Sequence, residues 1–269
     1  MTDDNAVVKK VDRKAERVAR RAQKQRINAS RSVRRKMMKF AQDERFALSL
    51  AEAIPLYWDG FYTVETADEM DFTESLRFFD WFFFDYSDEN SERPYKLFQA
   101  EAADQLDEKE KEILDGWEEV FPPSAYEFLD YDGYSNRFKL RDYFTKEEFT
   151  AQSTAGPGAS KKGDLILTRL VPVGSEIVFS VVAAYIPEDE IAGLAETFEA
   201  ARTADQEANP DASYVEFFRR HSYLIVHHAL SQSVAEGRFA VSRLDPTRID
   251  KAVKRSAKKI AKKFKRKRK

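Results

Sequence analysis

Three histidines near the C-terminal end of the chain are the first residues whose chemistry could support a site. His221 and His228 are seven residues apart, so on one continuous helix they share a face and could bind a metal ion together with a carboxylate. The i, i+4 spacing typical of helical metal ligands is absent from His221, His227 and His228, and a core or interface role is more common on an apolar helix. The chain also has no Cys, which excludes thiolate metal sites, cysteine nucleophiles and disulfides. We therefore predict no bound metal and no other cofactor.

Two aspartates bracket a dense aromatic segment. Asp80 and Asp85 could act as an acid–base pair in an apolar setting. Five residues on a helix turn the second side chain about 140° away from the first, which favours separate surface or capping roles. The metalloprotease H-E-x-x-H, the esterase G-x-S-x-G and the dinucleotide-binding G-x-G-x-x-G are missing from the sequence. No catalytic residue is assigned, although a site dispersed along the chain stays open.

The distribution of charge is more informative than the formal net charge of −2. Residues 1–46 hold 15 Lys and Arg against 6 Asp and Glu, a net charge of +9. Residues 245–269 hold 13 against 2, a net charge of +11, so residues 47–244 carry −22. Such segregation is typical of tails that bind an anionic partner.

Polycationic segments bind phosphate backbones by releasing counterions, without sequence preference. Arginine in particular suits bidentate contact with phosphate. We therefore predict a non-enzymatic protein that associates with RNA or ribosomes through its arms, and whose acidic core meets a protein partner. The candidate nucleic-acid-binding residues are Arg17, Arg20, Arg21, Arg34, Arg35, Lys258, Lys259, Lys262, Lys263, Lys265 and Arg266.

Other interpretations of the basic arms stay open. The first alternative is a protein-interaction adaptor whose arms engage acidic protein surfaces, including the chain's own core. Contact with an anionic membrane surface is disfavoured because the apolar face of the segment 249–264 has one aromatic residue, Phe264, and no Trp. The basic segments could also be solvated tails that aid solubility and bind no partner. Among the functions, a metal-dependent or hydrolytic enzyme ranks third.

The elements that position these residues follow from the hydrophobic periodicity. In the basic arm 1–46, a thin stripe of valine and alanine predicts a helix from Val8, with a break near Asn28 and a second helix from Val33 towards Pro55. The acidic half 47–123 contains the aromatic segment 71–86, predicted to be a buried helix. Asp107 and Glu110 have the spacing of an N-terminal capping pair for a further helix.

After residue 123 the period changes from helical to alternating. Residues 124–186 predict a small antiparallel β subdomain with strands at 126–130, 138–143, 164–170 and 177–185, as a meander or partly closed barrel. Residues 187–244 predict closing helices, the last of which begins at a capping box formed by Ser213 and Glu216. Residues 245–269 predict a basic amphipathic helix or tail. The fold class is therefore α+β with basic helical arms at both termini.

Four segments resemble one known group of proteins. They are Phe79-Asp-Trp-Phe-Phe-Phe-Asp-Tyr86, Tyr126-Glu-Phe128, Leu140-Arg-Asp-Tyr143 and Gly163-Asp-Leu-Ile-Leu-Thr-Arg-Leu170. In this order and spacing, residues 78–182 resemble the region that precedes the SEC-C zinc-binding motif in uncharacterised bacterial proteins. The chain departs from them in having no Cys, so the SEC-C module and its zinc are not expected here. The resemblance implies a bacterial cytoplasmic protein with a helical half followed by a β half, and it names no activity.

The same cytoplasmic location is expected from the sequence. No apolar run approaches the roughly 18 residues of a membrane span. The first residues lack the apolar region of a secretory signal.

Overall fold

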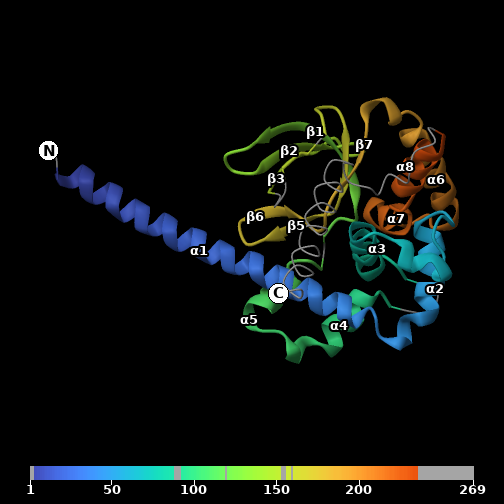
Figure 1. Cartoon of the computed structure of the whole chain (residues 1–269), viewed down its shortest axis with the longest axis horizontal. Helices are drawn as coiled ribbons and strands as arrows, with labels where there is room; N and C mark the ends of the chain where they lie inside the picture. The colour runs from blue at the N-terminus through green and yellow to red at the C-terminus, as the bar shows by residue number, and fades with distance from the viewer. Residues whose placement is uncertain (1–2, 88–91, 119, 153–155, 159, 236–269) are drawn as a thin grey trace, which may run out of the picture.

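The structure is a computed structural model that describes residues 3–87, 92–118, 120–152, 156–158 and 160–235. Helices precede and follow a mixed sheet, which confirms the predicted α+β class (Figure 1). The helices are α1 (Asp3–Phe40), α2 (Ala47–Tyr57), α3 (Phe72–Phe84), α4 (Pro94–Glu101), α5 (Glu108–Asp115), α6 (Leu194–Ala208), α7 (Tyr214–His221) and α8 (Leu224–Ala235). The strands are β1 (Ser124–Asp132), β2 (Arg137–Asp142), β3 (Glu148–Gln152), β4 (Leu165–Thr168), β5 (Leu170–Val173), β6 (Glu176–Phe179) and β7 (Ala184–Ile186).

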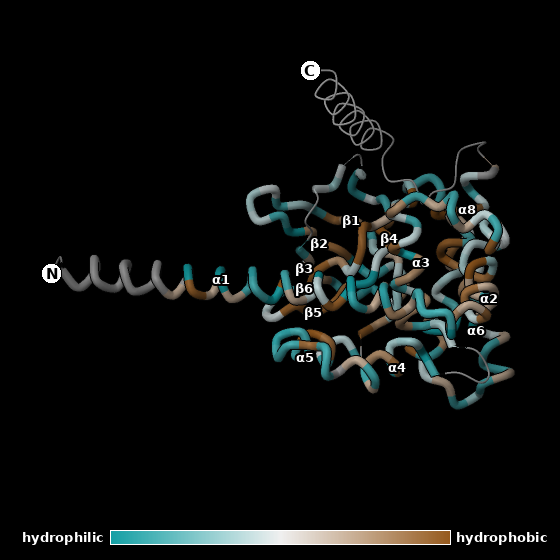
Figure 2. Tube along the Cα trace, turned by 60° about the horizontal axis from the view of Figure 1, so that its bottom comes forward, coloured by the Kyte–Doolittle hydropathy of each residue, from teal (hydrophilic) through white to brown (hydrophobic). Residues whose placement is uncertain are grey.

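Helix α1 is one uninterrupted helix of 38 residues, where the sequence pattern predicted two helices with a break near Asn28. Its N-terminal part extends away from the rest of the molecule (Figures 1 and 2). Its C-terminal part lies in the largest core cluster, where Val33, Met37 and Ala41 are buried. The basic segment 1–46 is therefore partly an arm and partly a core helix, because the second half of the same helix carries the wider apolar face.

Helix α3 is the buried aromatic helix that the sequence predicted. Phe78, Phe82 and Phe83 are almost fully buried, but Phe72 at its first position is exposed. The predicted capping boxes of α5, at Asp107 and Glu110, and of α7, at Ser213 and Glu216, are both formed, as is one at α3. Each satisfies backbone N–H groups that the first turn of a helix leaves unpaired.

The sheet has seven described strands in the order β5-β6-β3-β2-β1-β4-β7. All neighbouring pairs are antiparallel except β3 and β6, which are parallel. The predicted strand 164–170 is divided at Arg169 into β4 and β5, the segment 177–185 is divided into β6 and β7, and β3 was not predicted. The two divided segments thus serve both halves of the sheet: β5 and β6 form a hairpin at one edge, and β4 and β7 pair at the other.

Alternate residues of the central strands face two different cores, as the period of two requires. On one face, Ala125, Leu165 and Leu167 contact α6, α7 and α8 through a cluster that includes Phe198 and Phe218. The residues next to these in sequence, such as Tyr126 and Ile166, point to the other face. There they form a second cluster inside the curled sheet, which consists of Tyr126, Phe128, Phe138, Leu140, Ala151, Ile166 and Ala183. The sheet is therefore covered by the closing helices on its outer side.

The predicted last core helix is instead two helices. Helix α7 ends at His221 and α8 begins at Leu224, after a turn at Ser222 and Tyr223. His221 therefore does not share a helix with His227 and His228, and the face on which the metal interpretation depended is not formed. In the described ranges, no helix has both the length and the apolar character needed to cross a membrane.

Candidate functional site

The outward face of α1 carries a stripe of cations. Counting 100° per residue, seven exposed side chains lie on the face within about 40° of the direction of Arg17, and all of them except Asn28 are cations. From residue 17 to residue 39 this face is about 33 Å long at a rise of 1.5 Å per residue. We call these six cations the basic stripe: Arg17, Arg21, Lys24, Arg31, Arg35 and Lys39.

The acidic residues of α1 all precede the basic stripe, and the last of them is Glu16. From Arg17 to Phe40 the chain contains no Asp or Glu. Within the described part of the chain, none of the six stripe side chains takes part in an ion pair. Within the described residues, the stripe is therefore a row of exposed positive charges without a paired carboxylate.

The opposite face of α1 uses its cations differently. Arg26 Nε lies 3.2 Å from Glu112 Oε1, and Lys36 Nζ lies 2.6 Å from Glu110 Oε2, both on α5. Glu110 is buried, and although burial acts to raise its pKa, the hydrogen bonds from Lys36 and Ser32 hold that pKa below its usual value. These inner cations fasten α1 to the acidic core.

The structure divides the predicted nucleic-acid-binding residues into three groups. Arg17, Arg20, Arg21 and Arg35 are exposed, as binding requires. The predicted residues of the C-terminal segment lie outside the described residues: Lys258, Lys259, Lys262, Lys263, Lys265 and Arg266. Arg34 forms the third group, because its guanidinium is turned towards the core and not outward.

Arg34 is turned into the protein. Its guanidinium carbon lies 4.7 Å from the centre of the Trp117 ring, and its Nε and Nη2 atoms are buried. Burial lowers the pKa of Arg34 to about 10, against the opposing effect of the Asp80 carboxylate. A protonated guanidinium in this position stacks on an aromatic ring and is not available to phosphate.

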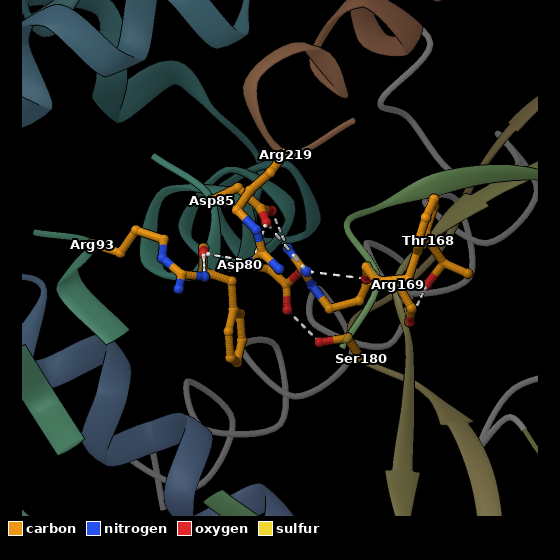
Figure 3. A network of polar contacts seen from close by, with 9 residues as sticks. Asp80, Asp85, Arg93, Thr168, Arg169, Ser180 and Arg219 are labelled. Carbon is orange, nitrogen blue, oxygen red and sulfur yellow. Dashed lines mark hydrogen bonds and ion pairs between the residues drawn. The ribbon is translucent and has the colours of Figure 1, made fainter. Parts of the chain in front are cut away.

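A buried charge network lies behind α1, where α3 meets the sheet (Figure 3). Arg169, between β4 and β5, has a fully buried side chain whose Nε donates to Asp80 Oδ2 at 2.8 Å. Its Nη2 donates to Asp85 Oδ2, and its Nη1 donates to the Phe121 carbonyl oxygen at 3.3 Å. One arginine therefore bridges two carboxylates on α3 and at its C-terminal cap.

Further contacts complete this network. Ser180 Oγ donates to Asp80 Oδ1, and Arg219 Nη1 on α7 lies 3.4 Å from Asp85 Oδ1. Burial acts to lower the pKa of Arg169, but Asp85 and Asp80 reverse that effect and raise it. Burial raises the pKa of Asp85, while the guanidinium groups of Arg169 and Arg219 act against that rise. The network thereby holds the helical half, the sheet and the closing helices together.

Sequence reasoning placed Asp80 and Asp85 in separate surface or capping roles, and the structure corrects this. Asp85 does cap α3, but both carboxylates are buried and meet at Arg169. Arg169 was not predicted as a functional residue. Its position inside the apolar run Leu165–Leu170 was the available signal, because an arginine in a buried strand needs anionic partners.

The three histidines have separate partners instead of a common one. His221 Nε2 lies 3.0 Å from Asp205 Oδ1, His227 Nε2 lies 2.7 Å from the Leu56 carbonyl oxygen, and His228 Nε2 lies 2.8 Å from the Glu190 carbonyl oxygen. Across the residues that the structure describes, no group of three or more potential ligands is arranged to hold a metal ion.

With this geometry established, we compared the chain with known proteins. Residues 24–223 match a protein family described only as a family of unknown function, DUF7986. The chain belongs to this family. The matched range contains the buried charge network and four members of the basic stripe, Lys24, Arg31, Arg35 and Lys39. No curated protein and no solved structure matches the chain significantly.

Proposed function

We propose that this DUF7986 protein binds RNA through the basic stripe of α1, without enzymatic activity and without base specificity. The observation that carries the proposal is the stripe itself, six exposed cations in one row on a helix that extends from the molecule. Phosphate contact by such a row releases counterions and supplies affinity that does not depend on sequence. The stripe offers no aromatic side chain on which bases could stack, so we expect contact mainly with the phosphate backbone.

The different roles of the two faces of α1 support the proposal. Arg26 and Lys36 are already paired with α5, so the helix is anchored on one face while the other stays charged. Anchoring fixes the stripe in space, which lowers the entropy lost when phosphate groups are bound. The basic C-terminal segment would add further contacts to the same polyanion.

The wider setting of the proposal is a bacterial cytoplasm, with RNA in ribosomes or free transcripts as the partner. A cysteine-free chain suits a reducing compartment, and the resemblance of residues 78–182 to SEC-C-type proteins supports the same location. The relation to those proteins stays part of this proposal.

The test compares two double variants that remove equal charge from one helix. Arg31→Gln with Arg35→Gln removes two stripe cations, whereas Arg26→Gln with Lys36→Gln removes two inner cations. Binding of the full-length chain to a fluorescein-labelled RNA is followed by anisotropy between about 50 and 200 mM salt. Circular dichroism checks that each variant is folded.

Six stripe contacts predict a slope of log affinity against log salt of about −4 to −5, so that affinity falls several hundredfold or more over this range. The stripe pair should reduce the slope by about 1.5, since each lost contact removes roughly 0.7 to 0.9. The inner pair should leave the slope nearly unchanged. Equal effects of the two double variants on the slope would show that net charge alone governs binding. An absence of binding at low salt would favour the adaptor function, in which the stripe engages an acidic protein surface.

A further inference from the structure

A second feature of the fold has no part in RNA binding. An internal cavity lies where α2, α3, the start of β1, β4 and α8 meet. Its volume is about 40 Å³. Much of its wall is apolar, with side chains such as Leu167, Val181, Ile225 and Leu230.

Four buried polar groups line this one cavity and have no hydrogen-bond partner within the described residues. They are Trp58 Nε1, Trp81 Nε1, Ser124 Oγ and Ser222 Oγ, on side chains only 1% to 3% exposed. They come from four separate parts of the chain, namely the C-terminal cap of α2, helix α3, strand β1 and the C-terminal cap of α7. Buried polar groups in proteins are almost always paired, so four unpaired groups around one space indicate a shared partner.

The chemistry of these groups defines that partner. An indole N–H can only donate a hydrogen bond, so the partner must carry an acceptor. The charged groups of the cavity wall have partners, because Asp80 pairs with Arg169 and Ser180, and Arg77 Nη1 donates to the Val182 carbonyl oxygen. A charged ligand would have to give up its water against a mostly apolar wall, which favours an uncharged partner.

Size and wall chemistry favour an organic molecule over water. A volume of this size would hold about three waters or one small organic molecule. The unpaired polar groups occupy only part of the wall, and waters placed against the apolar remainder would lose hydrogen bonds there, whereas carbon atoms would not. A carbonyl compound with an apolar body accepts hydrogen bonds from the donors with its oxygen, while its carbon atoms contact the apolar wall.

We propose that this cavity is a binding site for a small uncharged carbonyl compound of about four heavy atoms, or for the carbonyl end of a longer ligand. Trp58 and Trp81 donate to the carbonyl oxygen, and Ser124 and Ser222 complete its polar surroundings. The apolar body of the ligand lies against α8 and β4.

The experiment uses the three tryptophans of the chain as reporters. Trp117 is the internal control, because its Nε1 already donates to the Pro172 carbonyl oxygen at 2.9 Å and it does not line the cavity. Acetone is the probe, and isobutene, which has the same shape with CH₂ in place of oxygen, is the matched control ligand. The indole signals are followed in ¹H–¹⁵N spectra of the full-length protein during titration.

Acetone should shift the Trp58 and Trp81 signals along a saturable millimolar curve and leave the Trp117 signal in place. Isobutene should shift them less, since it accepts no hydrogen bond. Ser124→Val, which fills part of the cavity with methyl groups in a strand that tolerates them, should abolish the acetone response, and Ala229→Val on α8 provides a second such variant.

Three results would overturn the proposal. The first is no shift with acetone, together with cross-peaks between the two indoles and water, which would make the cavity a hydration site. The second is a linear shift of all three signals, which is an effect of solvent. The third is an acetone response that persists in both filled variants while circular dichroism shows them to be folded.

Discussion

Replacing Arg169 with Met is the most direct perturbation of the buried charge network. The side chain is completely buried and holds two carboxylates, at 2.8 Å for Asp80 and by a short contact for Asp85. Met keeps much of the apolar volume but none of the donors. Of their contacts within the described residues, Asp80 then keeps the one with Ser180 and Asp85 keeps the one with Arg219.

The expected loss is large because removal of one member of a buried ion pair leaves charge uncompensated. Such changes typically cost about 3 to 5 kcal/mol, a substantial part of the roughly 5 to 15 kcal/mol that stabilises a domain. The free energy of unfolding is measured by urea denaturation, followed by far-UV circular dichroism and tryptophan fluorescence. The matched control is Arg137→Met, because Arg137 forms a partly exposed ion pair with Glu176, and its loss should cost no more than about 1 kcal/mol.

Two additional measurements separate charge from packing. Adding Asp80→Asn and Asp85→Asn to Arg169→Met should recover part of the lost stability, because the carboxylates that were left unpaired are then neutral. In the single variant, the loss of Arg169 removes the largest effect that opposes burial, so the folded-state pKa of Asp85 lies further above its unfolded value. The stability deficit of this variant should therefore shrink as the pH is lowered from about 7 to 5. A loss no greater than that of Arg137→Met, or a deficit independent of pH, would refute the account of the network.

Two further predictions concern other parts of the fold. The hydrogen bond from Arg220 is the main cause that holds the pKa of Asp205 at about 2, well below an unfolded value of about 3.9. The stabilisation by the Asp205 carboxylate is then fully present above about pH 5 and is lost as the pH falls towards 2. Asp205→Asn should therefore lower the free energy of unfolding, measured by urea denaturation, by about 1 to 2 kcal/mol at pH 7 and by much less near pH 3. Equal losses at both pH values would contradict this. Deleting residues 1–16 should leave the midpoint of thermal unfolding within a few degrees of that of the full chain. Deleting residues 1–40 should abolish cooperative unfolding, because Val33 and Met37 lie in the main core. Cooperative unfolding of the chain that lacks residues 1–40 would show that α1 is dispensable.

Local features of the fold could be predicted from the sequence. The aromatic run 71–86 predicted a buried helix because its apolar residues cover most of a helical circumference, and α3 confirms it. The capping boxes at Asp107 and Ser213 were predicted from the identities of two residues three positions apart. The exposed cations of α1 follow from composition, since a thin apolar stripe cannot bury a helix on more than one side.

The tertiary structure alone decided which distant side chains meet. Periodicity relates residues of one helix to each other, and it correctly separates Asp80 from Asp85 by about 140°. Their convergence needs Arg169, more than 80 residues away, whose long side chain lies between them and bridges the gap. Arg34 differs from Arg35 for the same reason. The two are adjacent in sequence and chemically identical. Periodicity places Arg34 about 100° from Arg35 and outside the basic stripe, but only the tertiary structure shows that its guanidinium faces the distant Trp117 ring.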